Sequence, residues 1–300
     1  MKAILLTEYG DVDKLQLRDV PSPKPKKGEV RVKVAFTSIN PVDYKIRSGA
    51  AKAMFPQTFP AILGKDAAGE IVELGEGVTG FNKGDKVLAF VDHTYAEEVV
   101  VPVGNLAKVP EGLGLEQAAV LPLVVTTGAQ LVEHMNIQKG QTVLVTGALG
   151  PVARTAVYLA KERGAKVIAG VRKKDKEKAK DLRVDGVVGL DDEADLKGLP
   201  ELDGIASTIY GDLVNKLLPH VKKGGTIGSV VGPVPGAEER GLKVVAFSAT
   251  PNGKQLAELA EAVAKERFRI PIAKKLKLEQ MGEAHKAAEK GPGGKIVIAI

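Results

Sequence analysis

The feature that most constrains this chain is a regular alternation of short apolar runs and amphipathic segments after residue 140. Six runs have the length and composition of strands: 142–146, 166–171, 184–190, 202–208, 225–231 and 242–248. Helical patterns lie at 153–164, 174–183, 212–224 and 252–266. Strand–helix alternation at this spacing predicts a parallel sheet with right-handed crossovers.

The first 110 residues have a different pattern, in which polar and apolar residues alternate between glycine-rich turns. Strand patterns lie at 29–36, 67–78, 85–91 and 95–102, with a short helix at 41–49. A long apolar helical stretch, 115–135, contains a proline that marks a break. The chain closes with a helix at 278–291 and an apolar strand at 293–300. A chain of 300 residues organised in this way is expected to form two domains.

Composition excludes several classes of chemistry. The chain has no cysteine, so it has no disulfide, no thiolate nucleophile and no thiolate-bound zinc. It has no apolar run near the roughly 20 residues that a membrane span needs, and its first residues lack a signal-peptide pattern. A cytoplasmic protein is therefore expected. The 43 basic residues are interspersed with 37 acidic ones and no aromatic-rich basic strand accompanies them, so nucleic-acid binding is not expected.

The turn after the first run of the alternating region carries a loosened form of the glycine-rich dinucleotide fingerprint. Gly147 and Gly150 stand where a tight turn and a close backbone approach are needed, and Ala153 is small enough for helix and strand to pack. The following helix would offer free N–H groups to a diphosphate. The alternative is a steric turn without a ligand, and Pro151 removes one donor.

Basic residues follow the second run of the alternating region. Arg172, Lys173 and Lys174 stand where a site that prefers NAD usually has an acidic residue for the ribose 2′-hydroxyl. Three cations suit a 2′-phosphate and favour NADPH. The alternative is a solvated helix start, because the next residues are equally charged.

The order of motifs along the chain resembles the medium-chain dehydrogenase/reductase superfamily, in its zinc-independent quinone oxidoreductase-like branch. The resemblance covers almost the whole chain and rests on six segments: 38–49, 64–87, 95–102, 121–132, 143–157 and 293–300. It implies an α/β protein with a GroES-like β-barrel catalytic domain, residues 1–119 and 266–300. A doubly wound Rossmann domain, residues 120–265, would be inserted before the closing segment, with the active site in the cleft between them.

The resemblance also implies roles for individual residues. Asn40 resembles the polar residue beside the nicotinamide, and Tyr44 resembles the residue that lines the substrate pocket, so these two are the expected catalytic residues. Thr127 resembles the threonine that bonds the nicotinamide ribose or amide. The expected cofactor-binding residues are Asn40, Thr127, Gly147, Gly150, Pro151, Val152, Arg172, Lys173, Ser229, Val231 and Gly232, and no metal ligand is expected.

The chain departs from the zinc-dependent relatives at their metal site. It has Ser38 in place of a cysteine, and Lys65-Asp66 in place of a His-Glu pair, which is interpreted here as a structural pair in a turn. Pro151 and Ala153 replace the two glycines usual in the quinone oxidoreductase-like branch. Of the four histidines, His134, His220 and His285 are expected to be surface or packing residues, and His93 is near a segment that lines the cleft in relatives, where it could act as an acid.

The predicted function is hydride transfer from NADPH to an electron-poor acceptor, either a quinone or an α,β-unsaturated carbonyl. Without zinc an alcohol is not readily deprotonated, and Tyr44 or water is the candidate proton donor for an enone. Two alternatives stay open: an enoyl-thioester reductase, and a nucleotide-sensing or structural protein on the same fold without turnover. The resemblance suggests a homodimer acting on a small-molecule acceptor.

Overall fold

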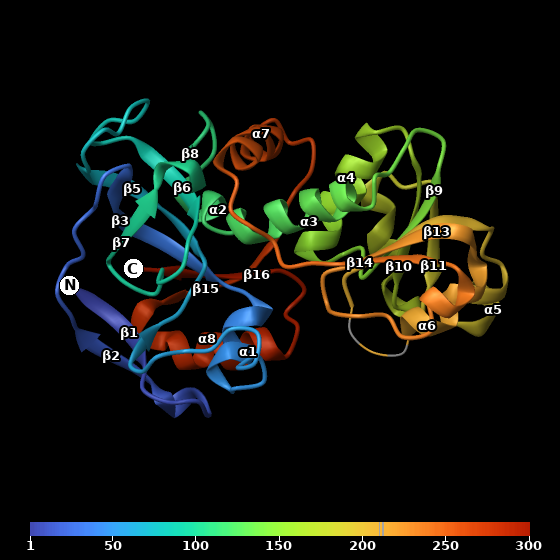
Figure 1. The fold of residues 1–300 in the computed structure, drawn as a ribbon, viewed down its shortest axis with the longest axis horizontal. Helices are drawn as coiled ribbons and strands as arrows, with labels where there is room; N and C mark the ends of the chain where they lie inside the picture. The colour runs from blue at the N-terminus through green and yellow to red at the C-terminus, as the bar shows by residue number, and fades with distance from the viewer. Residues whose placement is uncertain (210, 212) are drawn as a thin grey trace. The chain divides into compact units, whose positions relative to one another are not determined.

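Two units share the chain in the computed structural model, which describes residues 1–209, 211 and 213–300 (Figure 1). Unit 1 comprises Met1–Leu123, Pro251–Glu266 and Ile270–Ile300, and unit 2 comprises Val124–Thr250 and Arg267–Arg269. The expected boundary at residue 265 therefore differs from the structure, because residues 251–265 group with unit 1.

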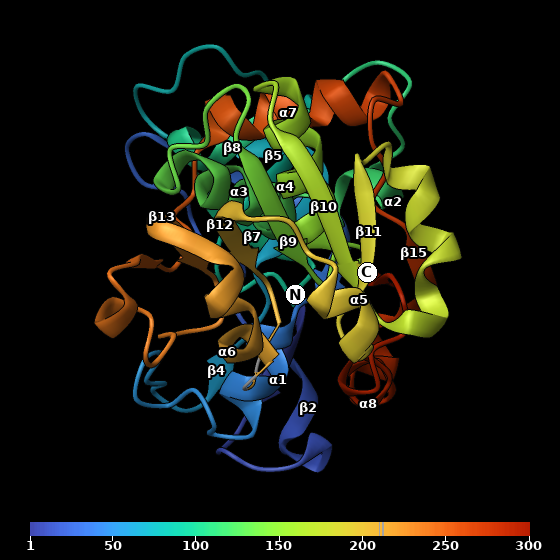
Figure 2. The same ribbon diagram turned by 90° about the vertical axis from the view of Figure 1, so that its right-hand side faces the viewer.

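Unit 2 is built on a six-stranded sheet in which every pair of neighbours is parallel. Its strands are β9 (Thr142–Thr146), β10 (Lys166–Val171), β11 (Gly186–Gly189), β12 (Leu202–Ser207), β13 (Val221–Ser229) and β14 (Lys243–Ala246). They lie in the order β11-β10-β9-β12-β13-β14, and Figure 2 shows this order from β11 to β13. This is the 3-2-1-4-5-6 order of a doubly wound fold, so the predicted Rossmann sheet is confirmed.

The helices of unit 2 are shorter than the sequence patterns suggested in two places. The sheet is accompanied by α3 (Pro122–His134), whose first two residues belong to unit 1, and by α4 (Pro151–Glu162), α5 (Glu193–Lys197) and α6 (Leu213–Leu217). The segment expected as a helix at 174–183 forms 3₁₀ turns instead, since only Ala179 is buried in its longer turn. The pattern at 212–224 gives way to β13 at Val221, after Pro219 in a 3₁₀ turn. Asp212, its expected start, lies outside the described residues.

Unit 1 contains two sheets. Three strands, in the order β2-β1-β4, are β1 (Lys2–Leu6), β2 (Leu15–Asp19) and β4 (Ala61–Ile62). The larger sheet comprises β3 (Glu29–Ile39), β5 (Asp66–Leu74), β6 (Lys86–Phe90), β7 (Glu98–Pro102), β8 (Leu106–Lys108), β15 (Ile272–Lys277) and β16 (Lys295–Ala299). Its strand order is β15-β16-β3-β5-β6-β8, and β7 also pairs with β3. The β-rich first domain is thereby confirmed.

The C-terminal strand returns to this larger sheet, as the resemblance implied. β16 pairs antiparallel with β3, with Ile296 opposite Ile39. The helices of unit 1 are α1 (Pro41–Arg47), α2 (Leu115–Ala118), α7 (Gly253–Ala264) and α8 (Met281–Glu289). α7 packs on β8 so closely that a Cβ at Gly253 would lie 2.3 Å from the carbonyl oxygen of Leu106. No helix among the described residues is long and apolar enough to cross a lipid bilayer.

A histidine is buried in the core of unit 1. His285 of α8 is fully buried, its ring meets that of Tyr95 edge-on at 5.8 Å between centroids, and neither ring nitrogen has a hydrogen-bond partner among the described residues. Burial, reinforced by the charge of Arg47, lowers the pKa of His285 to about 3. The ring is therefore neutral in the folded protein at any ordinary pH, as a packing residue would be.

This burial predicts a measurable loss of stability in acid. In the unfolded chain His285 takes up a proton below about pH 6.5. In the folded chain it does not do so until about pH 3. The stabilisation is thus complete above the unfolded pKa and is lost as the pH falls through this window, by about 1.4 kcal/mol per pH unit. Denaturant unfolding of the parent and of His285→Leu from pH 7 to 4 should show the parent losing its stability relative to the variant. A difference between the two that does not change with pH contradicts the assignment.

Candidate active site

The turn that follows β9 in unit 2 requires glycine at its first position. Gly147 has a φ of 61°, a left-handed conformation, and a Cβ there would lie 2.7 Å from Cγ2 of Ile209. The N–H of Gly150 donates to the carbonyl oxygen of Gly147 at 2.8 Å and closes the turn. At Gly150 a Cβ would meet only the carbonyl oxygen of Gly147, at 3.1 Å, so the fold alone does not require glycine there.

The first turn of α4 leaves backbone donors without acceptors. Gly150 is the N-cap and no side chain caps the helix, while Pro151 fills the first position, where a donor is not needed. The N–H of Arg154 donates to the carbonyl oxygen of Gly150 at 2.9 Å, but those of Val152 and Ala153 have no acceptor among the described residues. The Arg154 side chain is tied to the same turn by its Nε, which donates to the carbonyl oxygen of Leu149 at 3.0 Å. Open donors, the helix dipole and a cation together fit a diphosphate.

Buried hydroxyl groups end three neighbouring strands at this edge of the sheet. Thr146, Ser207 and Ser229 are the last residues of β9, β12 and β13, and all three are fully buried. Thr208 links two of the strands, since its N–H donates to Oγ1 of Thr146 at 3.0 Å and its own Oγ1 donates to the Thr146 carbonyl oxygen at 2.7 Å. Oγ of Ser207 has no partner among the described residues. The strand order reverses between β9 and β12, which is where doubly wound sheets bind ligands.

Helix α3 lies against the glycine turn. A Cβ at Gly128 would be 2.5 Å from the carbonyl oxygen of Val152, so the neighbouring Thr127, which is 9% exposed, lies close to the first turn of α4. Oγ1 of Thr126 is buried without a partner among the described residues.

The predicted loop after β13 is held by its own first residue. The N–H of Val231 donates to Oγ of Ser229 at 3.3 Å, and Gly232 has a φ of 119°. Thr127, the glycine turn and the loop from Ser229 to Gly232, all predicted to bind the cofactor, thus lie in unit 2, whereas Asn40 lies in unit 1. Sequence reasoning missed Thr146 and Ser207, although each is a polar residue that ends an apolar run.

The predicted 2′-phosphate cations have carboxylate partners. Arg172 pairs with Asp175 at 2.7 Å, and Lys173 pairs with Asp192 at 2.9 Å. Ion pairs with Lys178 and Arg172 hold the pKa of Asp175 below its usual value. Both cationic side chains are nevertheless about two-thirds exposed, at 68% and 69%, so they face water as well as their partners.

Unit 1 contains a buried polar network around the carboxylate of Asp66, the first residue of β5. Oδ2 accepts from Oγ of Ser38 at 2.6 Å and from Nδ2 of Asn40 at 2.7 Å, and lies 3.2 Å from Nζ of Lys295. Oδ1 accepts the N–H of Leu123 at 2.7 Å, in the first turn of α3. Asp66, Ser38 and Asn40 are fully buried and Lys295 is 4% exposed.

Asn40, predicted to lie beside the nicotinamide, makes hydrogen bonds to three members of this polar region: Asp66, Lys295 and Asp43. Its Oδ1 accepts from Nζ of Lys295 at 2.5 Å, and its backbone N–H donates to Oδ2 of Asp43 at 2.8 Å. Its side chain is completely buried, and its hydrogen bonds hold Asp66 and Lys295 in place. Its contact with a cofactor stays a prediction.

The residues at the position of the relatives' metal do not fit a zinc ion. The hydroxyl of Ser38 donates to Asp66, and the Lys295 ammonium beside that carboxylate supplies the positive charge that a metal would bring. No three His, Asp or Glu side chains of the described residues converge on a possible metal site. The interpretation of Lys65 and Asp66 as a pair is wrong, because successive residues of an extended chain point to opposite sides. Lys65 pairs instead with Asp92.

A pocket of about 690 Å³ adjoins this network in unit 1, and it is called here the acceptor pocket. Apolar side chains supply much of its wall: Ile46, Met54, Phe55, Pro60, Ile62 and Leu63. Four titratable residues also line it: Asp43, Lys65, Asp92 and His93. Burial raises the pKa of Asp43 to about 6, although donated hydrogen bonds from Asn40 N–H and Tyr95 O–H oppose the rise. Tyr44, the second predicted catalytic residue, is half-buried on the same helix and is not among the lining residues.

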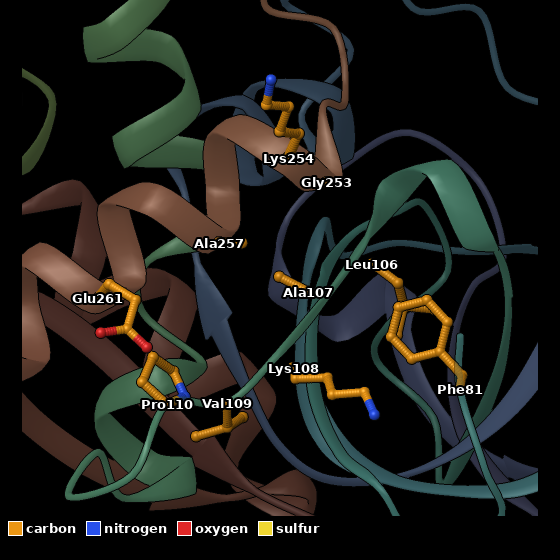
Figure 3. Close-up of a pocket in the computed structure, with 10 residues that line it drawn as sticks. All are labelled: Phe81, Leu106, Ala107, Lys108, Val109, Pro110, Gly253, Lys254, Ala257 and Glu261. Atoms are coloured by element: carbon orange, nitrogen blue, oxygen red, sulfur yellow. The ribbon is translucent and has the colours of Figure 1, made fainter.

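A second hollow of about 500 Å³ lies in unit 1 between β8 and α7 (Figure 3). Its cation Lys108 pairs with Asp85 and lies 5.7 Å from the centre of the Phe81 ring. Its carboxylate Glu261 pairs with Lys265. Lys108 and Glu261 are thus already paired, and the hollow is also lined by Lys254 of α7.

Comparison with known proteins agrees with this geometry. Residues 26–111 match the family model described as the alcohol dehydrogenase GroES-like domain, and residues 164–298 match the model described as zinc-binding dehydrogenase. A solved structure of the quinone oxidoreductase from Coxiella burnetii superposes with a TM-score of 0.90 at 30% identity, covering 100% of this chain and 99% of that one.

Curated relatives are similar over part of their length. The chain is 37% identical over 199 residues to the chloroplast envelope quinone oxidoreductase homolog of Arabidopsis thaliana, a match that covers 63% of this chain and 60% of the relative. It is 31% identical over 272 residues to 2-methylene-furan-3-one reductase of Solanum lycopersicum, covering 86% of this chain and 68% of the relative. With both domain models matched and the whole fold shared, the chain belongs to the medium-chain dehydrogenase/reductase superfamily, in its quinone oxidoreductase-like branch.

Proposed function

We propose that this chain is an NADPH-dependent oxidoreductase that reduces a quinone or an α,β-unsaturated carbonyl compound without a metal ion. The observation that carries the proposal is the turn after β9, where the N–H groups of Val152 and Ala153 are open at the reversal point of the sheet. The two kinds of acceptor are those named for the relatives, a quinone and a 2-methylene-furan-3-one, which is an unsaturated ketone.

Different residues of unit 2 would bind different parts of the cofactor. The open N–H groups and Arg154 would hold the diphosphate, and Thr127 with the loop from Ser229 to Gly232 would hold the nicotinamide end. The bound cofactor supplies the hydride. The buried hydroxyls at the strand ends keep that edge of the sheet polar without admitting bulk water.

Arg172 and Lys173 support NADPH over NADH. The two cations are exposed, although the side chains of Asp175 and Asp192 are only 6% and 17% exposed. Asp175 also pairs with Lys178, so Arg172 can turn to a phosphate without leaving that carboxylate unpaired. A phosphate offers a larger charge and more acceptor oxygens than a carboxylate.

The acceptor pocket supports an apolar, electron-poor substrate. Its wall, which includes Phe55, Ile62 and Leu63, would exclude water from a bound ring. Ser38 and Lys295 both donate to Asp66, where the zinc-dependent relatives hold their metal. Neither can polarise a substrate as a Lewis acid does, so acceptors that need no metal are favoured. Asn40 would act by holding α1 in place, and the role of Tyr44 as a proton donor stays a prediction.

The activity is tested by following NADPH oxidation with a simple quinone, an enone and an enoyl thioester, each with and without exhaustive chelation. We expect turnover of the quinone and the enone that chelation does not reduce. Turnover of the thioester alone supports the acyl-substrate alternative. NADPH binding without turnover of any acceptor supports a nucleotide-sensing protein, and activity that chelation abolishes and zinc restores refutes the metal-free proposal.

The phosphate-binding turn is tested by Gly150→Ala. Because the fold leaves nearly enough room for this methyl group, stability should change by less than about 1 kcal/mol, the low end for overpacking. A bound diphosphate would meet the same methyl group, so the affinity for NADPH should fall about tenfold or more. Gly198→Ala in unit 2, where the nearest atom is 3.6 Å away, is the control and should bind as the parent does. Unchanged affinity in folded Gly150→Ala means that the turn binds no diphosphate.

Cofactor preference is tested by replacing Arg172 and Lys173 together with Ala. We expect the affinity for NADPH to fall about tenfold, the order of a lost charge-assisted hydrogen bond, while that for NADH stays within about twofold. Lys180→Ala with Lys197→Ala removes the same charge from unit 2 and should change neither. Equal weakening of both cofactors, or equal affinities in the parent, contradicts the 2′-phosphate role.

A further inference from the structure

The loop that carries His93 is held in place at the acceptor pocket. The N–H of Val91 donates to the carbonyl oxygen of Lys65 at 3.1 Å, and the N–H of Tyr95 donates to that of Leu63 at 3.0 Å, so both flanks of the loop are fixed to the pocket wall. Between them His93 adopts a φ of 71°, a left-handed conformation that non-glycine residues rarely adopt. A conformation of this kind costs of order 1 kcal/mol and persists only where its surroundings impose it.

The imidazole of His93 is oriented by one hydrogen bond. Its Nδ1 lies 2.8 Å from the carbonyl oxygen of Ile62. A carbonyl oxygen has no hydrogen to give, so Nδ1 must be the donor and must keep its proton in both charge states of the ring. The proton that the ring can gain or lose is therefore the one on Nε2. The residue is exposed, so Nε2 can be reprotonated from water.

The other titratable residues of the acceptor pocket are less suited to donate a proton. Lys65 and Asp92 pair with each other. Asp43 has one oxygen, Oδ2, that accepts from Asn40 and Tyr95, and a second, Oδ1, without a partner among the described residues, but at 1% exposure it is shut off from the water that would reprotonate it. His93 alone among the four combines an exposed ring, a fixed orientation and a nitrogen left over for a substrate.

We propose that His93 is the general acid for enone reduction in the acceptor pocket, which rests on the proposed function. The enone takes up a hydride at its β-carbon, and the electron pair of the double bond moves to the carbonyl oxygen as an enolate. Nε2 of the cationic ring then gives its proton to the α-carbon of the enolate, the carbonyl double bond is restored, and Nε2 is left with a lone pair. One hydride and one proton are thus added across the double bond, and water restores the ring. A quinone needs this acid less, because its ring stabilises the product oxyanion.

The test compares an enone with a quinone in His93→Gly and His93→Asn. Glycine and asparagine both tolerate the left-handed conformation, so the loop should be kept. A general acid contributes roughly 10²- to 10⁴-fold, so we expect kcat for the enone to fall about 100-fold or more in both variants. Quinone turnover and NADPH affinity should stay within about twofold. Added imidazole should restore enone turnover in His93→Gly, whose vacated side-chain volume can admit it.

A second readout does not depend on rate. An enone with an α-methyl group, reduced to completion, gives a product whose new stereocentre records how the proton arrived. The parent should give one configuration in excess, and both variants should give nearly equal amounts of the two. Equal losses with enone and quinone, or unchanged enone turnover and stereochemistry, overturn the role of His93. A parent that reduces neither acceptor refutes the proposed function itself.

Discussion

The packing of unit 1 depends on the hydrogen bonds and the ion pair made by the buried carboxylate of Asp66. This carboxylate accepts hydrogen bonds from segments that lie far apart in sequence: Ser38 and Asn40 around the end of β3, Lys295 of β16 and the first turn of α3. A carboxylate buried this completely is tolerated only when donors and an opposite charge surround it, and removing one partner of such a pair typically costs about 3–5 kcal/mol. The chain closure by β16 and the start of α3 are therefore tied to the same charge.

This network also determines what chemistry unit 1 can support. The hydroxyl of Ser38 stands where a zinc-dependent relative has a cysteine, and the positive charge beside Asp66 is the ammonium group of Lys295. Under the proposed function, the substrate is then polarised by its own conjugation. In the proposed reduction of an enone, the side chain that gives the proton is one that lines the pocket.

The sequence predicted the architecture well because its signals are local. Each strand of unit 2 is an apolar run, and the turn after β9 is marked by Gly147, whose left-handed conformation the structure requires. Pairings over long sequence distances were not predictable. Nothing in the pattern of β16 shows that Lys295 points inward to a carboxylate 229 residues away. Nor does the row of cations after β10 reveal that Asp192, on a different loop, pairs with Lys173. Lys65 and Asp66 were misread because adjacency in sequence was taken for adjacency of side chains.

The glycine turn of unit 2 and the acceptor pocket of unit 1 differ in what holds each of them together. The turn after β9 is made of backbone groups, so Pro151 is accepted at the first position of α4, where no intrahelical hydrogen bond is lost, while the N–H groups of Val152 and Ala153 stay open. The acceptor pocket is made of side chains, and those from Met54 to Leu63 lie outside the hydrogen bonds of Asp66. Substitutions there can change the shape of the pocket, and so the acceptors that fit it, without disturbing the buried carboxylate of Asp66. The proposed cofactor turn thus rests on backbone geometry, whereas the pocket in unit 1 rests on side chains that can be exchanged.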